Sequence, residues 1–309
     1  MSSLMTNTAA MTALKSLQAT NAALETTQSR ISTGLKVGEA SDNAAYWSIA
    51  TTMRSDNKAL GSVQDALGLG AAKTDVAYTG MNSAIDVVDE IKSKLVAARE
   101  PGVDKSKIQS EIGELQNQLT SIATSASFSG ENWLFVDSAA ADYTATKEIV
   151  GSFNRAADGS VSVGTVDVDT SSVHLFDSNG GGAGAGLLDT DFTTTGAGAV
   201  TVSVSDLDIT AAGIDDTDLD EMISAVDSSI SSMTTAASDL GSTKSRIDMQ
   251  NNFVGDLMDA IDRGIGTLVD ADMTKESTRL SALQTQQQLG TQALAIANGS
   301  AQSILSLFR

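Results

Sequence analysis

The chain has 309 residues and a formal net charge of −20, with 39 acidic against 19 basic side chains. Because nucleic-acid binding requires clustered lysine and arginine, this balance argues against a phosphate-backbone partner. The chain has no cysteine, which excludes disulfides and cysteine-based zinc sites, and it has a single proline, which permits very long helices.

The N-terminal segment is almost uncharged. Residues 1–24 carry Lys15 as their one charged side chain, and Leu17, Leu24 and Ile31 recur at intervals of seven, with Leu14 close by. Chain ends are usually solvated, so a long, neutral, amphipathic end predicts a surface that becomes buried. The segment lacks the basic start and apolar run of a secretory signal, and no cleaved signal peptide is expected.

Residues 44–99 are predicted to form one long coiled-coil helix, because apolar and small side chains repeat every seven residues in two rows. The first row is Met53, Leu60, Leu67, Thr74, Met81, Val88 and Leu95. The second row is Asp56, Val63, Gly70, Ala77, Ala84, Ile91 and Ala98. Pro101-Gly102 predicts a turn. A second helix follows, with apolar residues at 4-3-4-3 spacing: Ile108, Ile112, Leu115, Leu119 and Ile122.

The middle of the chain loses the helical period. Alternating valines predict strands around residues 161–168 and 200–204. Between Asp137 and Asp227 there are 17 acidic residues against two basic ones, Lys147 and Arg155. We therefore expect a small β-rich insertion that faces solvent.

Residues 216–270 repeat the heptad signal and predict a third long helix. One row is Leu219, Val226, Met233, Leu240, Ile247, Val254, Ile261 and Leu268. Its partner row contains the polar residues Lys244 and Asn251, which are expected to fix the register of the helices at some cost in stability.

The C-terminal segment from Leu280 to Phe308 has no charged side chain. Leu280, Leu294 and Phe308 share one seven-residue row, and Leu283 and Ile304 share another. Glutamine, serine and threonine occupy the remaining faces. A neutral surface avoids the repulsion that a charge would meet if copies of the chain packed together. No run reaches the ~18 apolar residues that a transmembrane helix needs.

No catalytic constellation is evident. The one histidine, His174, is expected to be an ordinary surface residue, and no HExxH, GxSxG or P-loop pattern occurs. The acidic run 215–221 fails the EF-hand pattern, because Glu221 stands where glycine is required. Carboxylates at a helix N-terminus explain it better. We expect no enzyme activity, cofactor or metal. Periodicity alone leaves open a coiled-coil bundle without a further role.

Two sets of motifs carry a family resemblance. The segment 29–37, SRISTGLKV, followed by ASDNAA at 40–45, resembles the N-terminal motif of bacterial flagellins. The C-terminal signature of that family resembles SRI at 245–247, DADMTKE at 270–276, and the tail 295–308. The resemblance covers about residues 1–135 and 215–309.

The resemblance implies a layered, mainly α molecule, in which N- and C-terminal segments form a long antiparallel coiled-coil rod. Residues 1–40 with 271–309 would form the inner coiled coil, 41–135 with 215–270 the helical rod, and 136–214 a variable β-rich surface insertion. The implied function is that of a structural subunit that self-assembles into the flagellar filament. A hook–filament junction protein of the same family is the alternative.

The resemblance also implies site residues and partners. Assembly positions in the inner core would be Leu14, Leu17, Leu24, Ile31, Leu280, Leu283, Leu294, Ile304 and Phe308. Other subunits, an export chaperone, hook-associated proteins and cap proteins would be the partners. The chain would leave the cell through the flagellar secretion system and be extracellular.

The N-terminal motif coincides with the segment that plant immune receptors bind in this family. Its matching positions here are Arg30, Ser32, Thr33, Gly34, Ser41, Asp42 and Asn43. Gly38-Glu39 and Tyr46-Trp47 replace more typical residues, so recognition is expected to be weakened. The segment 89–94, DEIKSK, lacks the arginine usual where an animal receptor binds, with the same expectation.

Overall fold

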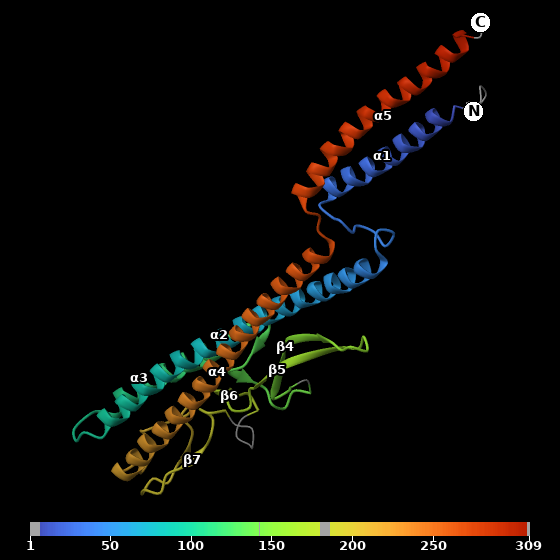
Figure 1. Ribbon diagram of the computed structural model, residues 1–309. Coiled ribbons are helices and arrows are strands. Elements are labelled where there is room, and N and C mark those ends of the chain that lie inside the picture. Colours follow the sequence, from blue (N-terminus) through green and yellow to red (C-terminus); the bar gives the residue numbers. More distant parts are fainter. Residues whose placement is uncertain (1–6, 142, 180–185, 308–309) are drawn as a thin grey trace. The chain divides into compact units, whose positions relative to one another are not determined.

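The computed structural model describes residues 7–141, 143–179 and 186–307, with side chains up to residue 299 (Figure 1). The described helices are α1 (Thr8–Thr33), α2 (Ala44–Ala98), α3 (Lys105–Ser125), α4 (Asp216–Val269) and α5 (Met273–Leu307). The chain divides into two compact units, residues 1–58 with 258–309 and residues 59–257. The mainly α fold with a small β insertion is confirmed. None of the described helices is both long and apolar enough to cross a membrane.

The unit made by residues 1–58 and 258–309 contains two antiparallel terminal helices, α1 and α5 (Figure 1). The Asn7 side chain donates to the Ala297 carbonyl at the start of α1, and Arg30 near its end lies against Glu276. A small apolar core lies near the end of α1 and the start of α5. It consists of Val37, Ala50, Ile265 and Val269.

In the unit of residues 59–257, α2 and α4 pack along the predicted heptad rows. Every member of both α2 rows from Leu60 to Ala98 is buried, as is the α4 row from Leu219 to Val254. Each such aliphatic side chain contributes about 1.5–3 kcal/mol when fully removed from water. This unit therefore has a continuous aliphatic core along the helices.

Ion pairs show the antiparallel register of α2 and α4. Arg99 binds Asp220 with two hydrogen bonds of 2.7 and 2.6 Å. Lys92, seven residues earlier in α2, binds Asp227, seven residues later in α4. Lys244, predicted as a polar seam residue, pairs with Asp75 at the edge of the contact. Equal steps along both helices mean that the register does not slip between these pairs.

The strands lie between residues 127 and 202. They are β1 (Ser127–Phe128), β2 (Glu131–Asn132), β3 (Phe135–Val136), β4 (Thr146–Arg155), β5 (Val161–Asp169), β6 (Phe176–Asp177), β7 (Phe192–Thr193) and β8 (Thr201–Val202). Most have two residues, whereas β4 and β5 have ten and nine. β4 and β5 form an antiparallel hairpin with a bulge between Val150 and Ser152. β3 and β6 pair in parallel. The strand prediction at 161–168 is confirmed, and β8 falls within the predicted 200–204, whereas β4 was not foreseen.

The prediction of a surface position for His174 is wrong. It is 5% exposed, within a run of buried residues from Val173 to Asp177. Its Nδ1 lies 3.1 Å from the Thr170 carbonyl oxygen. Main-chain hydrogen bonds tie this segment to distant ones: the Leu187 amide donates to the His174 carbonyl, and the Leu175 amide donates to the Leu134 carbonyl. Such long-range contacts are not visible in the local sequence.

Two glutamines of α3 form hydrogen bonds with the backbone of the insertion. The Gln109 amide donates to the Leu207 carbonyl at 3.0 Å and accepts from the Ile209 amide at 2.9 Å. Gln116, seven residues later, donates to the carbonyls of Val204 and Leu207. Glutamine side chains thus replace water at backbone groups of the insertion.

Candidate assembly interface

The facing sides of α1 and α5 form a heptad seam. Its α1 members are Ala10, Ala13, Leu17, Thr20, Leu24, Thr27 and Ile31, all buried or half-buried. Its α5 members are Glu276, Leu280, Leu283, Gln287, Gly290, Leu294 and Ala297, with the same burial. Alternating steps of three and four residues keep each row on one side of its helix.

Small and polar side chains bring the two helices together within this seam. A Cβ atom added at Gly290 would lie 3.1 Å from Leu17 Cδ1, so glycine gives this leucine its space. The Gln287 amide donates to Asn21 Oδ1 at 2.8 Å. The helices α1 and α5 therefore lie close together and are joined by a side-chain hydrogen bond. Much of the seam between them is half-exposed.

The outer faces of the same helices carry exposed apolar side chains. Met11 is 64% exposed and Leu14 46% on α1, while Leu289 is 58% and Ile296 73% exposed on α5. Nearby charge is sparse along these helices. Apolar surface of this kind, beside a half-exposed seam, is typical of a protein–protein contact.

The predicted assembly residues divide into three groups. Leu17, Leu24, Ile31, Leu280, Leu283 and Leu294 meet in the α1–α5 seam. Leu14 lies outside it, on the exposed face. Ile304 belongs to α5, but its side chain lies outside the described part, and Phe308 lies outside the described residues altogether.

Main-chain hydrogen bonds between residues 34–37 and 269–271 connect the terminal helices to the rest of their unit. Gly34 ends α1 with φ +73°, a left-handed conformation that favours glycine. Leu35 then forms an antiparallel bridge with Asp270, and the Ala271 amide donates to the Gly34 carbonyl at 2.8 Å. The Val269 carbonyl accepts from both Lys36 and Val37.

The motif residues after Gly34 shape the loop that enters α2. The Asp42 carboxylate accepts from the amides of Gly38 and Glu39, and these bonds hold its pKa below the usual value. Asn43 accepts from the amides of Ala45 and Tyr46 at the start of α2. The Asn43 bonds cap α2 and satisfy amides that a helix start leaves unpaired, whereas the Asp42 bonds hold the loop before it.

The remaining motif residues lie around the end of α1. Ser32 and Thr33 are exposed, and the Thr33 hydroxyl donates to the Ser29 carbonyl. The Ser41 hydroxyl donates to the Glu39 carboxylate. Arg30 extends to Glu276 of α5. Sequence reasoning did not anticipate Thr27, Gln287 and Glu276 as seam members, because it searched the heptads for apolar residues; their spacing was the available signal.

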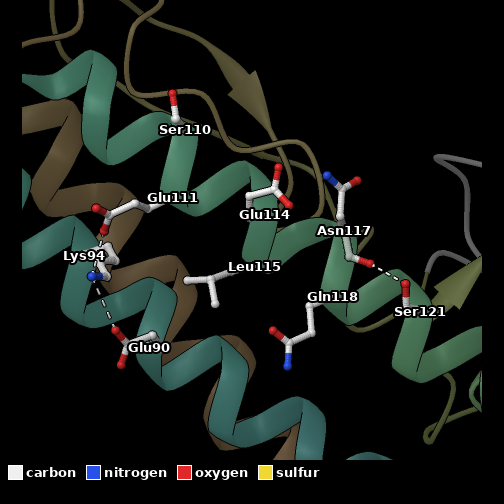
Figure 2. Close-up of a pocket in the computed structure, with 9 residues that line it drawn as sticks. All are labelled: Glu90, Lys94, Ser110, Glu111, Glu114, Leu115, Asn117, Gln118 and Ser121. Carbon is white, nitrogen blue, oxygen red and sulfur yellow. Dashed lines mark hydrogen bonds and ion pairs between the residues drawn. The ribbon is translucent and has the colours of Figure 1, made fainter.

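A second surface feature is a groove between α2 and α3 (Figure 2). Its volume is about 830 Å³, and Lys94 bridges Glu90 at 3.5 Å and Glu111 at 2.7 Å across it. Leu115 is the apolar member of a lining that is otherwise charged or polar. The Lys94–Glu111 pair joins α2 to α3, whereas Lys94 and Glu90 lie one turn apart in α2. The hydroxyls of Ser110 and Ser121 donate to carbonyls one turn earlier in α3.

The acidic run before α4 has a structural role. The carboxylates of Asp215 and Asp218 accept backbone amides of Gly196, Ala197 and Gly198 from the loop between β7 and β8. Glu221 accepts from the Thr195 amide. Among the described residues, no group of three or more acidic, histidine or cysteine side chains is arranged to hold a metal.

Comparison with known proteins gives a consistent result. Residues 4–138 match the bacterial flagellin N-terminal helical region, and residues 223–308 match the bacterial flagellin C-terminal helical region. Flagellin C of Rhizobium meliloti strain 1021 is 55% identical over 322 aligned residues, and flagellin A of that strain is 47% identical over 397. A flagellin of Brucella melitensis is 46% identical over 310 residues.

Each of these three alignments covers 100% of this chain and 100% of the relative. Among solved structures, the crystal structure of Bacillus cereus flagellin matches with a TM-score of 0.39 and 16% identity, covering 62% of this chain and 88% of that chain. Sequence identity along the whole length therefore decides the assignment. The chain belongs to the family of bacterial flagellins.

Proposed function

We propose that this chain is a structural subunit of the bacterial flagellar filament and acts through self-assembly outside the cell. The observation that carries this proposal is the α1–α5 pair, with its half-exposed heptad seam and its exposed Met11, Leu14, Leu289 and Ile296. A surface of this kind is stabilised when other copies cover it. Neither the described residues nor the relatives, which are named flagellins, favour the hook–filament junction alternative.

The proposal extends to a layered arrangement of the subunit in the filament. Residues 1–40 with 271–309 would be the inner layer, 41–135 with 215–270 the helical layer around it, and 136–214 the outer surface. Charge supports this order, since the two chain ends are nearly neutral and the insertion is strongly acidic. Like charges repeated in every copy repel least where water screens them.

The family also suggests how the subunit reaches the filament. We propose export as an unfolded chain through the flagellar secretion system, with a chaperone covering the C-terminal helix beforehand. Hook-associated and cap proteins would contact the two ends of the filament. The absence of cysteine is compatible with this route, because no disulfide can form before export.

Seeded polymerisation tests the filament function. Purified chain is mixed with short filament fragments and followed by electron microscopy and sedimentation, and long tubes are expected. A chain that lacks residues 280–309 is the matched control. It should remain monomeric while circular dichroism still shows the α2–α4 helices. Short caps in place of tubes would favour the junction function, and tubes formed by the truncated chain would remove the assembly role of α5.

We further propose that immune recognition of residues 29–50 is weakened by Gly38-Glu39 and Tyr46-Trp47. A synthetic peptide of these residues should give a reduced oxidative burst in plant tissue. The matched control is a peptide from a flagellin that has the more typical residues at those positions. Equal responses would refute the proposal.

A further inference from the structure

The β4–β5 hairpin carries an apolar patch on one face. Phe153 pairs with Val163, and Arg155 pairs with Val161, across the two strands. Because side chains two positions apart lie on the same face of a strand, these four share one face. Val161 is 50% and Val163 56% exposed, and in the described part between residues 127 and 215 they are the only exposed large apolar side chains. We call these three apolar residues, with Arg155 at their edge, the hairpin patch.

The base of the hairpin is held in place within the same unit. Ile149, on the opposite face of β4, is 7% exposed. Gln250 of α4 donates to the Gly151 carbonyl at 2.9 Å. Arg246, one turn earlier in α4, donates to the Asp167 carbonyl at 2.8 Å. These contacts fix the hairpin to α4, so it presents the hairpin patch in a defined orientation.

A second exposed apolar patch lies on α4 itself. Met249 is 63% and Phe253 59% exposed, and their spacing of four residues makes them neighbours on one side of the helix. The exposed Asp256 follows Phe253 by three residues and therefore lies beside it. We call these three residues the α4 patch. It combines apolar surface with a carboxylate, whereas the hairpin patch combines apolar surface with a guanidinium, so the two are complementary.

We propose that the hairpin patch of one copy binds the α4 patch of another copy in the filament, with Arg155 beside Asp256. The proposal rests on the filament function given above. Both patches are exposed in the single chain, and the contact would remove their apolar surface from water. Because the two patches differ, the contact is head to tail. Contacts of this kind can repeat from copy to copy and generate an open helical filament.

Disulfide trapping tests the contact directly, because the chain has no cysteine of its own. One chain carries Val163→Cys and another carries Phe253→Cys, and the two are polymerised together from seeds under oxidising conditions. A disulfide requires Cα atoms within about 7 Å of each other. We expect a covalent dimer of the two chains in the tubes and none in the mixed monomers, with the linked peptides identified by mass spectrometry. The matched control replaces the second chain by Ser228→Cys, at another exposed position of α4, and should give no dimer.

Charge exchange tests the ionic part of the contact. Arg155→Glu would place a carboxylate opposite Asp256, and we expect the critical monomer concentration to rise about two- to fivefold, the ratio that corresponds to an exposed charge pair. Arg155→Glu combined with Asp256→Arg should recover most of this loss. Arg155→Glu combined with Asp239→Arg, at an exposed position far along α4, is the matched control and should recover none. Circular dichroism of the monomers should be the same for all these chains.

Several results would overturn the inference and leave the filament function intact. One is the formation of normal tubes without the dimer between positions 163 and 253. Another is a dimer of two Val163→Cys chains, which would mean that the hairpins meet each other. If the cysteine chains form no tubes, the charge exchange decides, and equal recovery by Asp256→Arg and Asp239→Arg would contradict the contact. Failure of the unaltered chain to polymerise would instead overturn the filament function, and this inference with it.

Discussion

Individual carboxylates and glycines determine how the insertion is attached to the start of α4. Asp218 is 0% exposed and accepts amides of Gly196 and Gly198 at 3.0 and 3.1 Å. A side chain does not fit at Gly198, because its Cβ atom would lie 2.7 Å from the Gly213 carbonyl carbon. In the sequence these acidic residues resemble a cation site. In the structure their carboxylates accept hydrogen bonds from the amides of the β7–β8 loop, and glycines allow this loop to lie close to the start of α4.

Gly198→Ala is therefore expected to destabilise the unit of residues 59–257. The added methyl group would meet backbone atoms of Gly213 and Ile214, which cannot rotate away as a side chain would. Overpacking of this kind costs about 1–3 kcal/mol. Thermal unfolding in a Trp47→Phe background, followed by fluorescence of the buried Trp133, measures it. Gly113→Ala in α3 is the control, since its Cβ meets nothing within 4 Å and should stabilise the helix by roughly 0.5–1 kcal/mol.

Asp218→Asn should remove stability at neutral pH and little at low pH. Hydrogen bonds from the Thr194 side chain and from the amides of Asp215, Gly198 and Gly196 lower the pKa of Asp218. A lowered folded-state pKa gives stability that is present above the unfolded value of about 3.9 and is lost as the pH falls through the folded value. Denaturant midpoints of both chains should therefore converge as the pH falls below the unfolded value and through the lower folded value. A constant difference would contradict this assignment.

At the scale of elements, heptad spacing predicted α2, α3 and α4 closely. Buried seven-residue rows determine these helices by themselves, so local sequence was sufficient. The parallel pairing of β3 with β6 was not predictable, because each strand has two residues and the partners are 41 positions apart (Phe135 with Phe176). His174 was misplaced for the same reason, since its burial depends on segments that are distant in sequence.

The terminal helix pair shows a further limit of heptad reading. Leu17, Leu24 and Leu294 lie in the α1–α5 seam, whereas Leu14, which the same apolar pattern grouped with them, is exposed on the outer face; the assembly role of all four stays a prediction. Apolar residues on two faces of one helix cannot be separated by hydrophobicity alone. Only spacing relative to small and polar partners, such as Thr27 and Gly290, distinguishes the seam from the outer face.

Leu294→Asp should block polymerisation and leave the remainder of the chain folded. Leu294 is half-buried in the monomer, and assembly would bury it further. A buried, unpaired charge costs roughly 3–5 kcal/mol per subunit. Sedimentation after seeding measures the effect, and Leu294→Met serves as the control because it retains apolar volume. Tubes formed by Leu294→Asp at normal concentration would show that this part of the seam stays wet in the filament.

At the scale of the whole molecule, the two units differ in how completely they bury their own seams. The α2–α4 rows within residues 59–257 are buried almost without exception, whereas most α1–α5 positions are half-exposed. Stability within a chain follows such differences, because regions with few buried apolar contacts open first. We therefore expect the unit of residues 59–257 to be stable alone, and we expect α1 and α5 to gain stability when other copies cover them.

Monomeric chain should consequently unfold in two stages. Trp133 in the unit of residues 59–257 is 3% exposed, and Trp47 in the other unit is 36% exposed, so Trp47→Phe leaves a fluorescence signal from Trp133 alone. Far-ultraviolet circular dichroism of this variant should show an early loss of helix at low urea, before any change in fluorescence. Hydrogen exchange should assign that loss to α1 and α5, because their seam lacks full burial. A single transition, in which helix content and Trp133 fluorescence change together, would mean that the terminal helices are as stable in the monomer as α2 and α4, and that assembly is not needed to fold them.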